Sequence, residues 1–274
     1  AGTLGVMRDV YIVTAERLRL RAEPHSGAKI LRYLVRGETV LRLDVAPGDD
    51  WWRVRLRHAV TGASVGWVAA QWLRERNPKP RIMSRDEMRE KLKAFTPKGS
   101  PALIDSIAEP LAEQLAAAKI DTPLRLQHFF AQSAYETDEF TSFLEGHGRL
   151  PDDYFREHCD PEGQWGPILG NTDKDDGPRY KGRGMLMLAG RTNYQTAGED
   201  LGLDLIHHPE MVERPENAVK TAIWIWRSRE MEKWADADDV AGVTRAFAGP
   251  LFDHIQGTLE GRAALVNQAR KVFR

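Results

Sequence analysis

The sequence lacks the features that would tie a protein to a membrane or to an oxidising compartment. Cys159 is the one cysteine among 274 residues, so no disulfide can form within the chain, and we interpret it as a small buried apolar side chain rather than a catalytic thiol. No run approaches the roughly 20 apolar residues of a membrane-spanning helix. Residues 1–10 also lack the apolar core of a signal peptide. We therefore expect a soluble protein with no membrane partner.

An excess of charge of either sign is also missing. The chain has 39 basic and 40 acidic residues, which give a net charge of −1. Such a balance offers no electrostatic capture of nucleic acid, so any polymer that binds is expected to be recognised by shape and hydrogen bonds. The adjacent His207 and His208, and His158 beside Cys159, lack the spaced partners of a zinc site. We expect no metal, no cofactor, no nucleic-acid partner and a monomer.

The composition that remains is that of a folded globular protein, and the length favours two domains. In the first quarter of the chain, apolar residues alternate with a period of two between turn residues, as is typical of short strands. The alternating runs are residues 10–13, 18–21, 30–34, 40–43, 51–56 and 66–68. Five or six short strands in so short a segment predict a small β-barrel.

The pattern changes after a segment that contains two prolines. Residues 77–81 (NPKPR) read as a linker, because proline interrupts both strands and helices. Ser84 followed by Glu87 then forms a capping box at the start of a helix. Amphipathic helical runs follow at residues 102–119, 123–135, 217–230, 240–247 and 257–273. The sequence thus predicts an all-β domain at residues 1–76 and a mainly α domain at residues 82–274, in which the Gly-, Pro- and Asp-rich stretch 150–179 forms part of a cleft wall.

Two glutamates are the candidates for chemistry. Glu136 ends the apolar helical run that begins before Phe129, and Glu145 follows nine positions later. In one continuous helix the two would lie on opposite faces, about 13 Å apart along the axis, so they can share a cleft only if the chain turns at residues 137–139. Glycoside hydrolysis requires one carboxyl that donates a proton and a second that activates water, and burial would raise the pKa of Glu136. Spacing alone, however, favours two solvated charges at helix ends.

The first domain resembles the bacterial SH3-like module that binds cell walls. The resemblance rests on residues 18–24, 37–40, 50–54 and 66–69. That family binds wall peptide or glycan, and the resemblance implies the same partner here. Trp51, Trp52 and Trp67 are the candidate wall-binding side chains. For each of them, packing in the core or at the rim of the barrel is the alternative.

The second domain resembles the lysozyme-like branch of glycoside hydrolase family 19, to which endolysins belong, over almost all of its length. The segments that carry the resemblance are residues 120–125, 130–137, 180–186, 190–194, 201–205 and 208–210. The resemblance implies a mainly α, lysozyme-like fold and an inverting mechanism. In that mechanism Glu136 matches the general acid and Glu145 the general base.

The same resemblance implies substrate-binding side chains around the two glutamates. They are Tyr135, Tyr180, Arg183 and Arg262, the last of which is expected near the acid. For Arg183, as for Arg191, a structural ion pair beneath the cleft is the alternative to substrate contact. For Tyr180 and Tyr194 the alternative is packing in the core.

The chain departs from the family pattern at several polar positions. Tyr135 replaces the usual histidine before the acid, Met187 replaces a glutamine, and Ala189 replaces a hydroxyl residue that helps to hold the attacking water. Residues 248–250 (AGP) replace an Asn-Gly-Gly turn. Each lost polar contact would weaken substrate binding by about 1–3 kcal/mol.

The leading hypothesis is an endolysin-like peptidoglycan hydrolase that cleaves β-1,4 bonds of bacterial wall glycan while the barrel holds it to the wall, through glycan strands or stem peptide. Such a protein acts at the bacterial cell wall. It is either encoded by a phage and released to the periplasm, or secreted. A chitinase shares the fold and both glutamates and is the first alternative. A wall-binding protein with weakened catalysis is the second, since Met187, Ala189 and Ala248 all remove polar groups.

Overall fold

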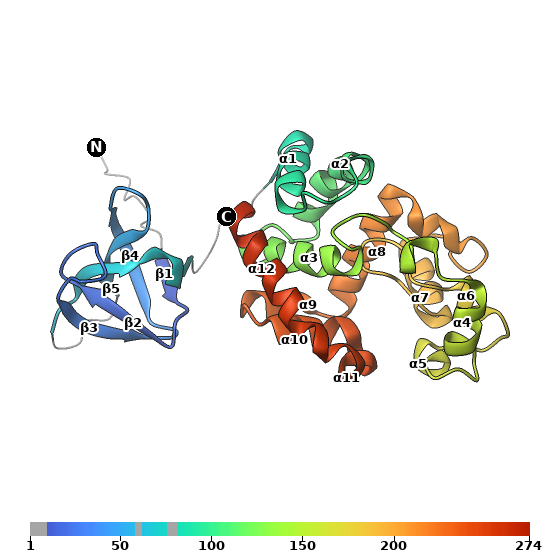
Figure 1. Ribbon diagram of the computed structural model, residues 1–274. Coiled ribbons are helices and arrows are strands. Elements are labelled where there is room, and N and C mark those ends of the chain that lie inside the picture. Colours follow the sequence, from blue (N-terminus) through green and yellow to red (C-terminus); the bar gives the residue numbers. More distant parts are fainter. Residues whose placement is uncertain (1–9, 58–61, 76–81) are drawn as a thin grey trace. The chain divides into compact units, whose positions relative to one another are not determined.

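The computed structural model describes residues 10–57, 62–75 and 82–274. The chain divides into two compact units, Ala1–Lys79 and Pro80–Arg274 (Figure 1). Each unit has its own hydrophobic core. The linker predicted at residues 77–81 lies outside the described residues.

The first unit is an SH3-like antiparallel sheet. Its described residues form seven strands in the order β3-β2-β6-β5-β4-β1-β7, with a short 3₁₀ turn, η1, before the last strand. The strands are β1 (Val10–Val13), β2 (Arg17–Arg21), β3 (Ile30–Val35), β4 (Thr39–Val45), β5 (Trp51–Leu56), β6 (Val65–Ala69) and β7 (Leu73–Glu75), and η1 is Ala70–Trp72. The six predicted strands are confirmed, and β7 is the one that the sequence pattern did not reveal.

Alternation along the strands produces the core of this unit. Leu18 and Leu20 of β2, and Val54 and Leu56 of β5, are buried, while the arginines between them are largely exposed. Gly66 of β6 is required because a Cβ there would lie 2.7 Å from the backbone oxygen of Arg21. Close pairing of β2 with β6 therefore depends on a glycine at this position.

The second unit is mainly α-helical. Its long helices confirm the five amphipathic runs to within two residues at each end, and Ser84 caps the first helix by accepting a hydrogen bond from the backbone N–H of Glu87 at 3.2 Å. The helices are α1 (Arg85–Phe95), α2 (Pro101–Ala117), α3 (Pro123–Glu136), η2 (Glu145–Gly148), α4 (Asp152–Cys159), α5 (Gly166–Leu169), α6 (Asp176–Arg179), α7 (Arg191–Leu201), η3 (Pro209–Glu213), α8 (Pro215–Ser228), α9 (Met231–Asp236), α10 (Val240–Ala248), η4 (Gly249–Leu251), α11 (Phe252–Ile255), η5 (Gln256–Thr258) and α12 (Leu259–Val272). In the described part of the chain, no helix combines the length and apolar character needed to cross a membrane.

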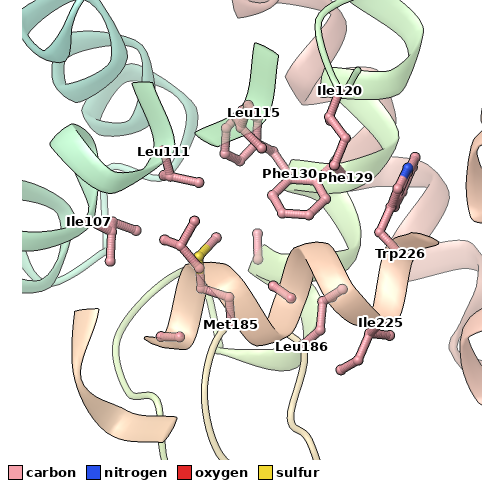
Figure 2. Close-up of a cluster of buried hydrophobic side chains, with 14 of the residues drawn as sticks. Ile107, Leu111, Leu115, Ile120, Phe129, Phe130, Met185, Leu186, Ile225 and Trp226 are labelled. Atoms are coloured by element: carbon pink, nitrogen blue, oxygen red, sulfur yellow. The ribbon is translucent and has the colours of Figure 1, made fainter. Parts of the chain in front are cut away.

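Helix α3 is the centre of this unit. Figure 2 shows Phe129 and Phe130 among side chains of α2 and α8, and Trp226 of α8 meets Phe129 edge to face at 5.6 Å between ring centroids. On another side of α3, Phe130 stacks on Phe273 at 4.5 Å, and α12 lies along α3 (Figure 1). Because α3 is buried over most of its length, the position of its last residue, Glu136, is set by the packing of the whole unit.

The separate cores predict that the helical unit folds without the sheet. A protein consisting of Pro80–Arg274 is expected to give a helical circular dichroism spectrum and one cooperative thermal transition. Its Tm should lie within about 4 °C of the corresponding transition of the full chain, since no core side chain is removed. A fragment that unfolds without cooperativity would contradict this expectation.

Candidate active site

The described part of the second unit contains a cavity of about 620 Å³, and both candidate glutamates line it. Glu136 enters at the end of α3 and Glu145 at the start of η2. Three of the expected substrate-binding side chains, Tyr135, Tyr180 and Arg262, line the same cavity. The stretch 150–179, expected in a cleft wall, contributes Cys159, Trp165, Ile168, Leu169 and Gly177.

A tight turn brings the two glutamates to one cavity. Helix α3 ends at Glu136. After Thr137, three consecutive residues have positive φ: Asp138 at 47°, Glu139 at 59° and Phe140 at 62°. The reversal expected at residues 137–139 is therefore confirmed. Left-handed φ costs a non-glycine residue about 1–2 kcal/mol. Here the turn is held by Thr137, whose Oγ1 accepts from the Phe140 N–H at 2.9 Å, and by the complete burial of the Phe140 ring.

Glu136 is paired with a buried arginine of α12. Arg262 is 2% exposed, and its Nη2 donates to Glu136 Oε1 at 2.5 Å. The other Nη of Arg262 donates to Gln132 Oε1, and its Nε donates to Thr258 Oγ1 at 2.9 Å. The Arg262 guanidinium carbon also lies 4.2 Å from the centroid of the Tyr135 ring, and the side chains of Tyr135, Arg262 and Glu136 all line the cavity. Arg262 is thus held by contacts on several sides and fixes the Glu136 carboxyl.

Burial raises the pKa of Glu136 above its ordinary range, although Arg262 acts in the opposite direction. The negative charge of Glu145 adds a smaller upward effect on this pKa, which places the two carboxyls within electrostatic reach of each other. A carboxyl that retains its proton in a water-accessible cavity can act as a general acid.

Glu145 is held by the backbone of the Gly182-Arg183-Gly184 segment. The Gly182 N–H donates to Glu145 Oε2 at 2.7 Å, and the Glu145 N–H donates to the Gly182 carbonyl at 2.9 Å. A Cβ on residue 182 would lie 2.9 Å from that carboxylate oxygen, so a side chain there would displace the Glu145 carboxylate. The glycine thus lets the backbone approach the carboxylate closely enough to orient it.

Burial also raises the pKa of Glu145, and the Gly182 N–H, Lys181 and Arg183 act in the opposite direction. The groups that oppose the rise differ between the two glutamates: for Glu136 one buried arginine, for Glu145 a backbone amide and two more distant cations. Two carboxyls in different surroundings can divide into one acid and one base.

Arg183 lies beneath the cavity rather than in its lining, which differs from the substrate-binding role expected for it. It is 7% exposed, and its guanidinium donates to Glu213 at 2.9 Å, to the Tyr194 hydroxyl at 3.0 Å and to the backbone carbonyls of Arg179 and Lys181. These contacts leave Arg183 as a support for the loop that carries Gly182. Tyr194 is fully buried beside it.

Tyr180 is hydrogen-bonded within the fold and also lines the cavity. Its hydroxyl donates to the Ile206 carbonyl at 3.1 Å and the residue is 2% exposed, but part of it lines the cavity. Arg191 belongs to the structural set, since it donates from two nitrogens to the two carboxylate oxygens of Asp176, both at 2.6 Å. That ion pair ties the start of α7 to α6 and so holds the wall formed by residues 150–179.

The positions that depart from the family pattern all face the cavity. Met187 and Ala189 line it together with Ala248, Gly249 and Pro250. Met187 adopts a left-handed conformation, with φ at 44°. Cys159 also lines the cavity, and burial raises the pKa of its thiol to about 11, so it is protonated near neutral pH and is a poor nucleophile.

Among the lining side chains that the sequence did not mark are Arg229 and Phe247. Arg229 follows the end of α8 and Phe247 lies near the end of α10. Neither lies in a segment that carried the resemblance, so no sequence signal marked them. Among the described residues, no group of three or more histidine, cysteine or acidic side chains has the arrangement of a metal site.

The tryptophans of the first unit differ in how far they are exposed to solvent. Trp52 packs against the core of the first unit, with its ring 4.8 Å from that of Tyr11, and the Arg42 guanidinium lies over it at 4.9 Å. Its buried indole N–H has no hydrogen-bond partner among the described residues. Trp51 and Trp67 are half-buried, and Trp72 is 44% exposed. Surface available to a ligand is therefore greatest at Trp72 and smaller at Trp51 and Trp67.

Comparison with known families and proteins agrees with the two units. Residues 113–249, half of the chain, match the family of glycoside hydrolase 19 described as "Chitinase class I", and residues 16–74 match "Bacterial SH3 domain". Chitinase C from Streptomyces griseus, a crystal structure, has the same fold as the helical unit, with a TM-score of 0.52 and 20% identity over 72% of this chain and 95% of that chain.

Two rice proteins (Oryza sativa subsp. japonica) are similar in sequence. Chitinase 11 is 33% identical over 143 residues, which cover 52% of this chain and 49% of the relative. Chitinase 8 is 35% identical over 119 residues, which cover 43% and 40% respectively. The chain thus spans about half or less of the length of these relatives.

The raised pKa of Glu145 predicts a pH-dependent gain of stability in Glu145→Gln. A carboxyl whose pKa is raised by folding stabilises the folded state fully below its unfolded pKa, about 4.3, and loses that contribution as the pH rises through the folded pKa. Glutamine can still accept the Gly182 hydrogen bond but never ionises. We expect the variant to exceed the parent in free energy of unfolding by roughly 0.5–2 kcal/mol near pH 8 and to match it near pH 4, as measured by urea unfolding.

Glu157→Gln is the matched control for this comparison, because Glu157 is exposed on α4 and lies outside the cavity. It should show no such dependence on pH. A Glu145→Gln difference that is equal at both pH values would contradict burial as the cause.

Proposed function

Because the chain belongs to glycoside hydrolase family 19, we propose that it is an inverting glycosidase that cleaves β-1,4 bonds in the glycan of bacterial cell walls. The observation that carries the proposal is the pair of partly buried glutamates, Glu136 and Glu145, which line one cavity and are held by different partners. Tyr135 and Arg262 are proposed to shape the substrate site around the acid.

In the proposed reaction, Glu136 is protonated and Glu145 is ionised. Glu136 donates its proton to the glycosidic oxygen as the bond from that oxygen to the anomeric carbon breaks. Glu145 accepts a proton from a water molecule, whose oxygen attacks the anomeric carbon from the opposite face. The product therefore has inverted anomeric configuration. Arg262 and the Gly182 N–H keep the two carboxyls in position, and the protons that the two glutamates gain and lose balance over one turnover.

The SH3-like unit supports a cell-wall substrate. A module that binds the wall keeps the cavity at a high local concentration of an insoluble glycan, so the cleft itself needs fewer contacts with each sugar. This would compensate for the apolar Met187, Ala189 and Ala248 in the lining. The names of the relatives support the alternative, a chitinase, which would use the same two glutamates on a glycan without muramic acid.

The experiment that tests the proposal is incubation of the full chain with purified peptidoglycan and, separately, with chitin oligomers, followed by mass analysis of the products. We expect muropeptide products from peptidoglycan. Glu136→Gln should lower the rate by a factor of about 10² to 10⁴, because an amide has no proton to give to the departing oxygen. Glu157→Gln, with an exposed glutamate outside the cavity, should retain the parent rate.

The other outcomes distinguish the alternatives. Products from chitin oligomers alone would indicate a chitinase. An absence of products from the parent, together with turnover by the double variant Met187→Gln and Ala189→Ser, would indicate a wall-binding protein with weakened catalysis. A parent rate that survives Glu136→Gln would refute the assignment of the acid.

A role of the sheet in wall binding predicts a separable effect. The fragment Pro80–Arg274 should cleave short soluble glycans at a rate within about 3-fold of the full chain, because its cavity is unchanged, but it should sediment with intact walls at least about 10-fold less. Binding is measured by depletion of the protein from the supernatant over a range of wall concentrations. Equal sedimentation of the fragment and the full chain would contradict a tethering role.

A further inference from the structure

One guanidinium of the cavity wall, that of Arg229, has no carboxylate partner among the described residues. Arg229 lies directly after α8 and lines the cavity, half-buried. In the described part of the chain its side chain makes no hydrogen bond and no ion pair, and its guanidinium carbon lies 5.8 Å from the centroid of the Phe247 ring. The other two lysine or arginine side chains of the described lining are paired, Arg262 with Glu136 and Lys181 with Asp152.

Arg229 lies close to the proposed acid. The ring of Phe247 is contacted by two guanidinium groups, that of Arg229 at 5.8 Å and that of Arg262 at 5.4 Å. Because Arg262 is hydrogen-bonded to Glu136, a single aromatic side chain separates Arg229 from the pair at which the bond would be cleaved. A ligand group bound by Arg229 would therefore sit on a sugar in or next to the reacting site.

The surroundings of Arg229 do not compensate its positive charge within the described residues. Burial lowers the pKa of Arg229, and no carboxylate of the described residues offsets this effect. Glu230, its neighbour in sequence, is engaged by Lys233 at 3.2 Å. The carbonyl end of α8 provides only a partial negative charge. A cation held in a cavity under these conditions has unused hydrogen-bond donors that face the space where a substrate binds.

We propose that Arg229 binds a carboxylate carried by the glycan, and that it thereby distinguishes muramic-acid glycan from chitin. This inference rests on the proposed wall-glycan function. Peptidoglycan contains N-acetylmuramic acid, whose lactyl group ends in a carboxyl that is free or extended by a peptide, itself ending in a carboxylate. Chitin contains N-acetylglucosamine alone and has no acidic group. Guanidinium binds carboxylate through two parallel hydrogen bonds, a geometry that a neutral sugar cannot provide.

The test measures binding of small probes to the full chain by isothermal titration calorimetry. The probes are three forms of the disaccharide of N-acetylglucosamine and N-acetylmuramic acid. The first has a free lactyl carboxylate, and in the second that group is a methylamide. In the third the lactyl group is joined by an amide bond to a dipeptide that ends in a carboxylate. We expect the free acid to bind roughly 10-fold more tightly than the methylamide. If the dipeptide probe binds tightly, the carboxylate that Arg229 recognises is that of the stem peptide. If the dipeptide probe binds as weakly as the methylamide, the recognised carboxylate is that of the lactyl group.

Variants at Arg229 identify the residue responsible. Arg229→Met should bind acid and methylamide alike, and Arg229→Lys should retain part of the preference because it keeps the charge without the planar pair of donors. Arg227→Met, at an exposed position of α8 and outside the cavity, should keep the full preference. Thermal unfolding of each variant reports whether it is folded, and Arg229→Gln replaces the methionine variant if that one is not.

Two results would overturn the inference: equal binding of the acid, the methylamide and the dipeptide probe by the parent, or a full preference for a carboxylate probe that persists in Arg229→Met. Failure of the proposed function has a different signature. Cleavage of chitin oligomers without cleavage of peptidoglycan would refute the wall-glycan function, whereas the binding comparison decides the role of Arg229 without any turnover.

Discussion

The hydrogen-bonded pair of Arg262 and Glu136 is the interaction on which the rest of the site depends. It forms only because α12 packs along α3, with Phe273 stacked on Phe130 and Arg262 directed at the last turn of α3. Removing either member would leave a buried polar or charged group without its partner, so the hydrogen bond and the helix packing reinforce each other. Glu136 is thus positioned by the core of the helical unit and not by a surface loop.

Burial of charged groups in the cavity lowers the stability of the fold but favours the proposed chemistry. It raises the pKa of both Glu136 and Glu145, and it lowers that of Arg229, which has no carboxylate partner among the described residues. Charged groups are costly to bury, so a protein selected only for stability would keep fewer of them here. The pair of Arg183 and Glu213, by contrast, lies beneath the cavity and supports it. Groups that are costly to bury therefore gather where a substrate would bind.

Much of the fold was predictable because it follows from periodicity. Six strands and the five long amphipathic helices correspond to patterns of period two and 3.6, and the turn after Glu136 followed from the geometry needed to bring two carboxyls together. The short elements were not predictable: β7 has three residues, and α4 to α6 lie in a Gly- and Pro-rich stretch where tertiary contacts decide the conformation. The sequence could not decide between substrate contact and a structural ion pair for Arg183, because its partner, Glu213, is distant in sequence. Arg229 left no signal, since it is marked by the lack of a partner among the described residues in three dimensions.

The distance in sequence between Glu136 and Arg262 has a consequence for biosynthesis. The two residues are 126 positions apart, so α3 leaves the ribosome long before α12, which carries the arginine. Until α12 docks, Glu136 lacks its hydrogen-bond partner Arg262, and Phe130 lacks the ring of Phe273 that stacks on it. A nascent chain therefore carries an unassembled site until α12 has been synthesised and has packed against α3.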